Sequence, residues 1–259
     1  MNKTVLITGA SCGIGFEFAK IFARSGDNLI LVARSEKKLA EICRELSSEY
    51  NISACYYAKD LSLPDAAKDI FEKVTADGHK VDYLVNNAGF GDNHEFIKTD
   101  CDVHRNMIKL NILALTELCH LFGKEMCEQK NGKILNVASV AAFSSGPYMS
   151  VYYASKAFVL SFSEALAEEF ADYNVSVTCL CPGPTESNFG KFSDFDKSNA
   201  FKYISVAKAK DVAENGYKAM MKGKTLCYHG IAVKGMAFLT RLSPRFINRK
   251  FAKYMNKSK

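Results

Sequence analysis

Tyr152 and Lys156 lie four residues apart in a segment with helical spacing, and residues at this separation share one face of a helix. A lysine ammonium beside a phenol favours the phenolate, so it lowers the tyrosine pKa from its usual value of about 10. A phenol tuned in this way exchanges a proton with a bound substrate, which is general acid–base catalysis. Because such pairs also occur on solvated helices without a function, the interpretation depends on the residues that accompany this pair.

Two further polar residues accompany it. Ser139 follows the mainly apolar run 134–138, at the end of an expected strand, where open α/β sheets bind their ligands. Asn111 lies in a segment otherwise rich in apolar residues, where an asparagine is often only part of the core. Ser139 strengthens the interpretation of Tyr152 and Lys156 as a catalytic pair, whereas Asn111 by itself says little.

The segment 8–15 joins the first expected strand to the first expected helix and has glycines at positions 9, 13 and 15. Glycines there allow a sharp turn and a close approach of a pyrophosphate to the backbone. The free N–H groups and the positive dipole end of the helix then bind the phosphates. The segment therefore predicts a dinucleotide site.

Arg34, at the end of the second expected strand, indicates which dinucleotide binds. A carboxylate at this place would bind the adenosine ribose hydroxyls of NAD, whereas an arginine accommodates the 2′-phosphate of NADP. No Asp or Glu occurs from Asn28 to Ser35. We therefore predict NADP(H) rather than NAD(H).

Short apolar runs alternate with longer segments of helical spacing along the chain. The expected strands are 4–8, 28–33, 53–59, 83–86, 133–138 and 175–181, with 224–228 as a candidate for a last strand. The expected helices are 15–25, 36–50, 64–77, 101–129 and 151–173. Strands that are apolar on both sides and separated by helices predict an α/β fold, a parallel sheet covered on both faces. Without repeats or linker-like stretches, one domain over 1–259 is expected.

The 259 residues are 48% hydrophobic and 24% charged, the profile of a soluble globular protein. No apolar run reaches the roughly 20 residues that span a bilayer, and we expect no secretory leader. Nine cysteines without a paired framework predict reduced thiols and a cytoplasmic location. The histidines show no ligand spacing and Cys179-x-Cys181 has no second pair, so we predict no metal.

Charge is distributed unevenly, because eleven Lys/Arg and no Asp or Glu follow Glu214. A nucleic-acid-binding protein would usually spread basic charge over its folded body, so we predict no nucleic-acid partner. The basic segment 230–259 also carries apolar residues, which is typical of an amphipathic segment. It could lie on an anionic membrane surface, or pack on the domain or a second subunit, which is the commoner fate.

These motifs occur together and in order in one known family. The landmarks are 8–15, Asp60-Leu61, Asn86-Asn87-Ala88-Gly89, Asn111, Ser139, Tyr152 with Lys156, and Pro182-Gly183. Over about residues 3–230 the sequence resembles the short-chain dehydrogenase/reductase family, and its tail has a weaker likeness to long-chain 3-oxoacyl reductases and 17β-hydroxysteroid dehydrogenases. The resemblance implies a single doubly wound Rossmann-type domain with a seven-stranded parallel sheet and helices on both faces.

The resemblance also implies roles. Tyr152 would protonate a carbonyl oxygen as hydride arrives, Ser139 would bind that oxygen, and Lys156 would hold the nicotinamide ribose and lower the Tyr152 pKa. Asn111 would anchor a water through which protons reach Lys156, and Asp60 would contact the adenine. The residues expected to bind the cofactor are Gly9, Ser11, Cys12, Gly13, Ile14, Gly15, Arg34, Asp60, Leu61, Asn87, Ala88, Gly89, Tyr152, Lys156, Pro182, Gly183, Thr185 and Ser187.

Three positions qualify this pattern. Cys12 stands where NADP-preferring members often carry a cation, and Ser187 stands where the family usually has threonine. Tyr153, next to Tyr152, would point about 100° away round the helix and is expected to pack.

The segment 185–205 would be a lid over the substrate. Its aromatic residues at 189, 192, 195, 201 and 203 suggest an apolar substrate, unless these rings simply pack on the body. We predict an NADP(H)-dependent oxidoreductase that interconverts a ketone and a secondary alcohol on a hydrophobic hydroxysteroid, bile acid or 3-oxoacyl substrate, as a homodimer or homotetramer. The alternatives are an NAD-linked alcohol oxidase direction and a non-catalytic NADP(H) sensor.

Overall fold

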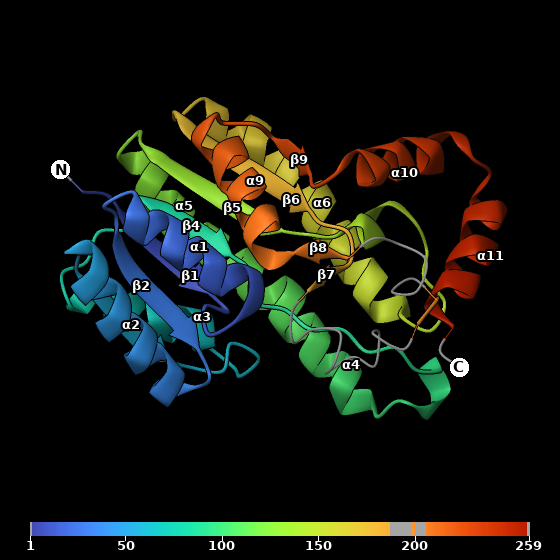
Figure 1. Ribbon diagram of the computed structural model, residues 1–259, viewed down its shortest axis with the longest axis horizontal. Helices are drawn as coiled ribbons and strands as arrows, with labels where there is room; N and C mark the ends of the chain where they lie inside the picture. Colours follow the sequence, from blue (N-terminus) through green and yellow to red (C-terminus); the bar gives the residue numbers. More distant parts are fainter. Residues whose placement is uncertain (1, 187–197, 200–205, 258–259) are drawn as a thin grey trace.

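A seven-stranded parallel sheet forms the centre of the molecule in a computed structural model of the chain (Figure 1). The structure describes residues 2–186, 198–199 and 206–257. The strands of the sheet are β1 (Thr4–Thr8), β2 (Asn28–Ala33), β3 (Ala54–Ala58), β4 (Tyr83–Asn86), β5 (Gly132–Val137), β6 (Val175–Cys181) and β9 (Leu226–Tyr228). Their order is β3-β2-β1-β4-β5-β6-β9, so the chain reverses its direction of travel between β1 and β4. The predicted fold class is confirmed.

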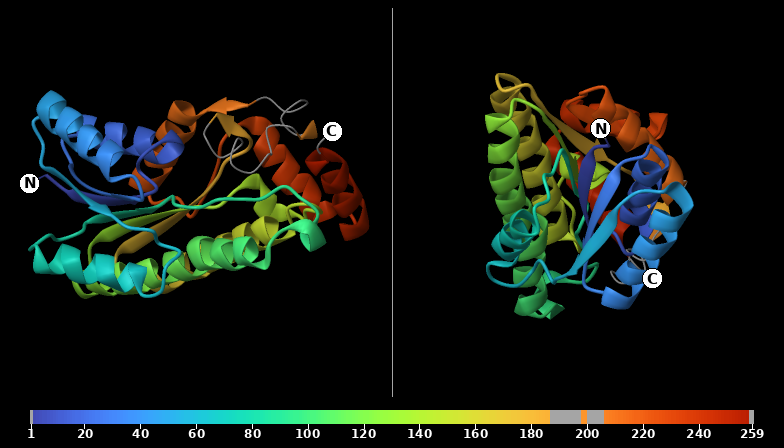
Figure 2. Two further views of the ribbon diagram at one scale, coloured as in Figure 1. Left: turned by 90° about the horizontal axis from the view of Figure 1, so that it is seen from below. Right: turned by 90° about the vertical axis from the view of Figure 1, so that its left-hand side faces the viewer.

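Helices cover both faces of the sheet, as the left view of Figure 2 shows edge-on. The helices on one face are α1 (Gly13–Arg24), α2 (Glu36–Tyr50) and α9 (Ala209–Met221). Those on the other face are α3 (Ala66–Ala76), α5 (Leu115–Glu128) and α6 (Ser150–Ala171). Successive residues of one strand point to opposite faces, so Val5 and Ile7 join the first core and Leu6 the second. This explains why the strands are apolar on both sides.

Two stretches differ from the expected helices. The expected helix 101–129 is divided into α4 (Cys101–Ile108), a π-helical segment (Lys109–Ala114) and α5. Helix α9 was not predicted, because its buried face is made mostly of small residues with a weak hydrophobic period: Val212, Ala213, Gly216, Ala219 and Met220.

A buried polar network connects the central strands to α6. The Asn86 Nδ2 donates to Asn136 Oδ1 at 2.9 Å, and the Asn136 Nδ2 donates to Ser163 Oγ at 3.0 Å. All three side chains are buried. A hydrogen-bonded network in a low dielectric is rigid, so it fixes α6 against β4 and β5 directly behind the carboxyl ends of these strands.

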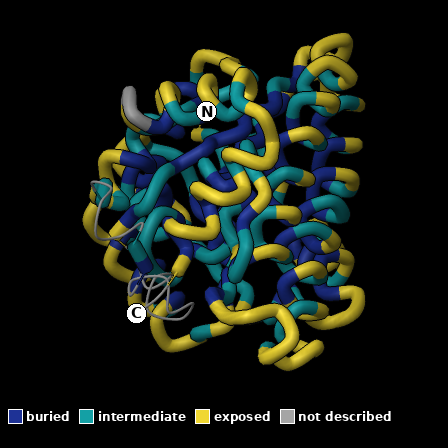
Figure 3. Tube along the Cα trace, turned by 90° about the vertical axis from the view of Figure 1, so that its right-hand side faces the viewer, coloured by how far each residue is buried: buried dark blue, intermediate teal, exposed yellow. Residues whose placement is uncertain are grey.

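The last two helices, α10 (Ile231–Leu242) and α11 (Arg245–Asn256), lie at one end of the molecule and bend around it (Figure 1). The tube in Figure 3, seen from that end, alternates between buried and exposed residues along the helices at the edge of the view. A separate short sheet pairs β7 (Thr185–Glu186) with β8 (Ala207–Lys208) in parallel. Most of the expected lid, including Ser187 and the five aromatic positions, lies outside the described residues. Within the described ranges, no helix is long and apolar enough to cross a membrane.

Candidate active site

A pocket of about 860 Å³ opens at the carboxyl ends of the strands, where doubly wound sheets bind ligands. It collects residues from eight separate stretches of the chain, between Gly9 and Met255. The predicted site residues that line it are Gly9, Ser11, Cys12, Gly13, Ile14, Arg34, Asp60, Leu61, Asn87, Ala88, Gly89, Ser139, Tyr152, Lys156, Pro182, Gly183 and Thr185. Gly15 and Asn111 are not among the lining residues.

The loop after β1 is closed tightly by Asn87. The Asn87 Nδ2 donates to the carbonyl oxygens of Thr8 at 3.0 Å and Gly9 at 3.2 Å. A Cβ added to Gly9, whose φ is +65°, would lie 2.8 Å from that nitrogen, and one added to Gly15 would overlap the Gly9 carbonyl oxygen. The glycines are therefore required by contacts within the protein, and Asn87 holds the loop in addition to facing the pocket.

The N-terminus of α1 points into this pocket and is suited to bind an anion. The Cys12 side chain makes no capping hydrogen bond, and the first turn of α1 carries no acidic side chain. Unpaired N–H groups at the positive end of a helix dipole bind phosphates. The loop and the helix therefore fit the pyrophosphate of a dinucleotide.

Arg34 lines the same pocket, directly after the end of β2. Its guanidinium is 4.0 Å from the Asp60 carboxylate, and its side chain is 77% exposed, so the ion pair is loose. Lys38, in the first turn of α2, also lines the pocket and was not predicted. Two cations thus line the pocket beside the end of β2.

The predicted catalytic residues Ser139 and Lys156 are held at the end of β5. Ser139 Oγ accepts a hydrogen bond from the Ala141 N–H at 3.1 Å, which caps the short 3-10 helix Val140–Phe143. Lys156 Nζ donates to the Val137 carbonyl oxygen at 2.8 Å. Since both contacts are to the backbone next to β5, the sheet itself sets the positions of these two residues.

Burial controls the pKa values of the Tyr152 and Lys156 pair. Loss of hydration lowers the pKa of Lys156 from 10.5 to about 8, against a smaller opposing effect of the buried thiols of Cys179 and Cys181. Tyr152 keeps some solvent contact through the pocket, yet burial raises its pKa to about 12, against the smaller lowering effect of its hydrogen bond with Ser139. The Tyr152 pKa thus lies above its usual value and not below it as expected, because desolvation is the largest effect on it. The Lys156 Nζ lies 5.8 Å from the Tyr152 ring centre.

Asn111 lies behind the pocket, in the π-helical segment, and is buried. Its Nδ2 donates to the Phe90 carbonyl oxygen at 2.9 Å and to Ser155 Oγ at 3.1 Å. A Cβ on Gly89 would approach Asn111 Oδ1 to 3.1 Å and Lys156 Nζ to 3.4 Å. A side chain at position 89 would therefore crowd both Asn111 and Lys156. The π-helical segment that carries Asn111 is of a kind that is frequent at functional sites.

The C-terminal helices form a wall of the pocket that the sequence analysis did not predict. The lining residues from this wall are Met236, Thr240, Asn248, Phe251, Ala252 and Met255. Tyr153, expected to pack, also lines the pocket, and its hydroxyl donates to Asn256 Oδ1 at 3.0 Å. Asn256 Nδ2 donates to the Pro147 carbonyl oxygen at 3.0 Å. One buried asparagine thus attaches α11 both to α6, which carries Tyr152 and Lys156, and to the loop after Ser139.

A glycine loop and a Ser139–Tyr152–Lys156 group on one doubly wound sheet define an oxidoreductase that uses a dinucleotide. The family model described as short chain dehydrogenase matches residues 3–197. The chain belongs to the short-chain dehydrogenase family and is an oxidoreductase of that family.

Similar proteins span most of the chain. The 3-oxoacyl-[acyl-carrier-protein] reductase FabG of Chlamydia muridarum is 27% identical over 209 residues, 80% of this chain and 84% of that protein. A short-chain dehydrogenase from Sphingobium yanoikuyae, solved in complex with NADPH, is 27% identical with a TM-score of 0.83 and 93% coverage of both chains. A bulky-bulky ketone specific alcohol dehydrogenase from Comamonas testosteroni is 25% identical, with a TM-score of 0.79 and 93% and 92% coverage.

Proposed function

We propose that this oxidoreductase uses NADP(H) to interconvert a ketone and a secondary alcohol on a hydrophobic substrate. The observation that carries the proposal is that Ser139, Tyr152 and Lys156 line the same pocket as the glycine loop and Arg34. The NADPH in the Sphingobium structure and the ketone substrates named for the Comamonas enzyme support it.

In this mechanism the bound NADPH supplies the hydride, and the protein supplies a proton and orientation. Tyr152, whose pKa is raised to about 12, holds its phenolic proton at neutral pH and donates it to the substrate oxygen as general acid. Ser139 is fixed by the Ala141 N–H and donates a hydrogen bond to the same oxygen, which stabilises the charge that develops there. Lys156, held by the Val137 carbonyl oxygen, lies beside Tyr152 and binds the ribose hydroxyls.

The substrate is proposed to be apolar because of the walls beyond Tyr152. Met149 and Tyr153 lie on one side, and Met236, Phe251 and Met255 on the other. Pockets of this composition bind apolar ligands and use a few polar groups for orientation. Ketosteroids, oxo-bile acids and 3-oxoacyl thioesters are the proposed classes, the last also supported by the name of the chlamydial relative.

The test is NADPH consumption with a panel of these three classes and simple aromatic ketones, with NADH in parallel. We expect turnover of one class with NADPH preferred. Tight NADPH binding without turnover of any ketone would contradict the proposed reaction and favour a sensor on the same fold.

The cofactor preference is tested by Arg34→Asp, with Arg44→Asp on the outer side of α2 as the matched control. Loss of a charge-assisted contact to the 2′-phosphate is expected to reduce kcat/KM for NADPH by about 10- to 100-fold and to leave NADH nearly unchanged. The Arg44 variant should keep the preference of the wild type. An unchanged ratio in the Arg34 variant would remove Arg34 from the phosphate site.

We also propose a cytoplasmic homo-oligomer. All nine cysteines lie within the described residues as free thiols, which supports a reducing compartment. Ile108, Leu113 and Phe158 are exposed apolar side chains on the α4, π-helical and α6 segments, and such residues support a subunit contact there.

A further inference from the structure

Helix α10 is apolar on the side that faces away from the protein. Its inner side is closed by Val233 and Ala237, which are buried. On the outer side Phe238, Leu239 and Leu242 are each more than 60% exposed. A helix at the surface of a globular protein normally turns polar residues outward, so this face lacks the partner that its composition requires.

Helix α11 follows α10 at the same end of the molecule, and its exposed side has a different chemistry. Its inner side is closed by Ala252, Met255 and Asn256, which are buried. On the exposed side, Arg245, Arg249 and Lys253 follow one another at intervals of four and so form one basic stripe. The apolar residues beside the stripe, each about half exposed, are Phe246, Ile247 and Tyr254.

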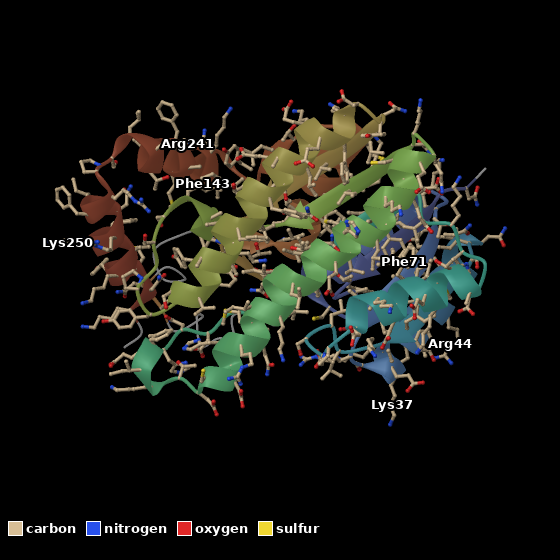
Figure 4. All side chains as sticks on the ribbon, turned by 180° about the vertical axis from the view of Figure 1, so that it is seen from behind. Lys37, Arg44, Phe71, Phe143, Arg241 and Lys250 are labelled. Atoms are coloured by element: carbon tan, nitrogen blue, oxygen red, sulfur yellow. The ribbon has the colours of Figure 1, made fainter. Side chains whose placement is uncertain are left out.

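Helices α10 and α11 bring exposed apolar side chains and basic side chains together at one end of the molecule. They supply half of the exposed large apolar side chains found among the described residues. No acidic residue follows Glu214, so the cations of α10 and α11 have no neutralising partner within their own segment. Figure 4 shows Arg241 and Lys250 at one end of the molecule, and Lys37 and Arg44 at the other.

We propose that the outer surface of α10 and α11 docks on an anionic lipid membrane. Phe238, Leu239 and Leu242 would insert between the headgroups, while the stripe on α11 binds the negative charge of the surface. A second copy placed symmetrically on this surface would bring two basic patches together, and a nucleic acid would leave the apolar side chains in water. A lipid headgroup layer is the partner that satisfies both the cations and the apolar side chains.

Docking would bring the membrane close to the pocket. Met236 and Thr240 of α10 line the pocket from the inner side of the same helix, and a helix is only about 10 Å thick. If the proposed function is correct, an apolar substrate dissolved in the bilayer would thus be concentrated beside the pocket. The docking itself rests on the surface and not on the reaction.

The role of the basic stripe on α11 is tested by flotation of the full chain with vesicles. The vesicles consist of phosphatidylcholine alone or of equal parts phosphatidylcholine and phosphatidylglycerol. We expect binding to the anionic vesicles only, reduced by at least about tenfold in the Arg249→Glu/Lys253→Glu variant. The matched control, Lys37→Glu/Arg44→Glu, makes the same change of net charge on exposed positions of α2 and should bind like the wild type. Equal losses in both variants, or equal binding to both vesicle types, would overturn the proposal.

The apolar face is tested in the same assay with Phe238→Ser/Leu242→Ser, and Leu63→Ser as an exposed apolar control. We expect the first variant to lose at least about tenfold in binding to anionic vesicles and the control to lose none. Light scattering gives the mass of each variant in solution, and NADPH titration shows that the pocket is intact. Absent vesicle binding, together with dissociation of an oligomer by the first variant, would overturn the proposal in favour of a second copy.

Discussion

The two walls of the pocket are built in opposite ways. The wall at the strand ends is made by residues fixed to the sheet, since Lys156 and Ser139 are both buried and hydrogen-bonded to the backbone around β5. The wall formed by α10 and α11 lies outside both cores, and its attachment depends on a few side chains, of which Asn256 is the best connected. The proposed chemistry is thus placed on the wall that is fixed to the sheet, and the proposed substrate contacts on the wall that is attached by fewer side chains.

This difference has an energetic reason. A proton donor must keep its position to within a fraction of an ångström, which only closely packed surroundings provide. A wall that selects substrates tolerates small displacements of its side chains, because it contributes the overall shape of the pocket and not the exact position of a reacting atom. We therefore expect substitutions in the first wall to alter kcat or the pH dependence of stability. Substitutions in the second wall should alter KM.

The largest effect is expected from Tyr152→Phe, which removes the proton donor and keeps the ring. Loss of a general acid should reduce kcat by about a thousandfold, while the Kd for NADPH stays within about twofold. Tyr153→Phe is the matched control, since it removes the neighbouring hydroxyl, and its kcat should stay within a few fold of the wild type. Residual turnover above a tenth in the Tyr152 variant would mean that another group is the acid.

The next effect concerns the buried ammonium of Lys156. Its pKa of about 8 in the folded protein is below the unfolded value of 10.5, so between these pH values unfolding takes up a proton. Stability contributed by this group therefore rises with pH across that window, by up to about 3 kcal/mol.

Urea unfolding at the two ends of this window tests the sign. The free energy of unfolding of the wild type should increase relative to that of Lys156→Met as the pH increases from about 8 to about 10.5. The exposed control Lys37→Met should show a constant difference from the wild type. A difference that is also constant for Lys156→Met would show that this ammonium is well hydrated.

The sequence was a good guide where a strong physical constraint acts on adjacent residues. The strand ends, the glycine loop and the spacing of Tyr152 and Lys156 are each local, so the pocket on the strand-end side could be predicted. The strands themselves are confirmed nearly to the residue for β1, β2, β4 and β6. The roles of the individual residues stay predictions.

The rest depends on contacts that no local pattern contains. Asn256 lies 103 residues from Tyr153 and 109 from Pro147, so its position on the pocket wall is not visible in the order of residues. The π-helical segment around Asn111 has a wider turn than an α-helix, and the spacing of apolar residues in the sequence does not reveal it. The Tyr152 pKa was mispredicted because the spacing of a lysine indicates charge, whereas burial follows from the whole fold.

The smallest effect, and the one that tests the second wall, is expected from Asn256→Ala. The substitution leaves the Tyr153 hydroxyl and the Pro147 carbonyl without their partner, which weakens the attachment of α11. The KM for a bulky ketone should rise by about tenfold, while kcat and the Kd for NADPH stay within about twofold of the wild type. Tyr153→Phe removes only one of the two contacts and should give an intermediate KM. A fall in kcat at unchanged KM would show instead that Asn256 positions the catalytic helix, and the two walls would then be one unit.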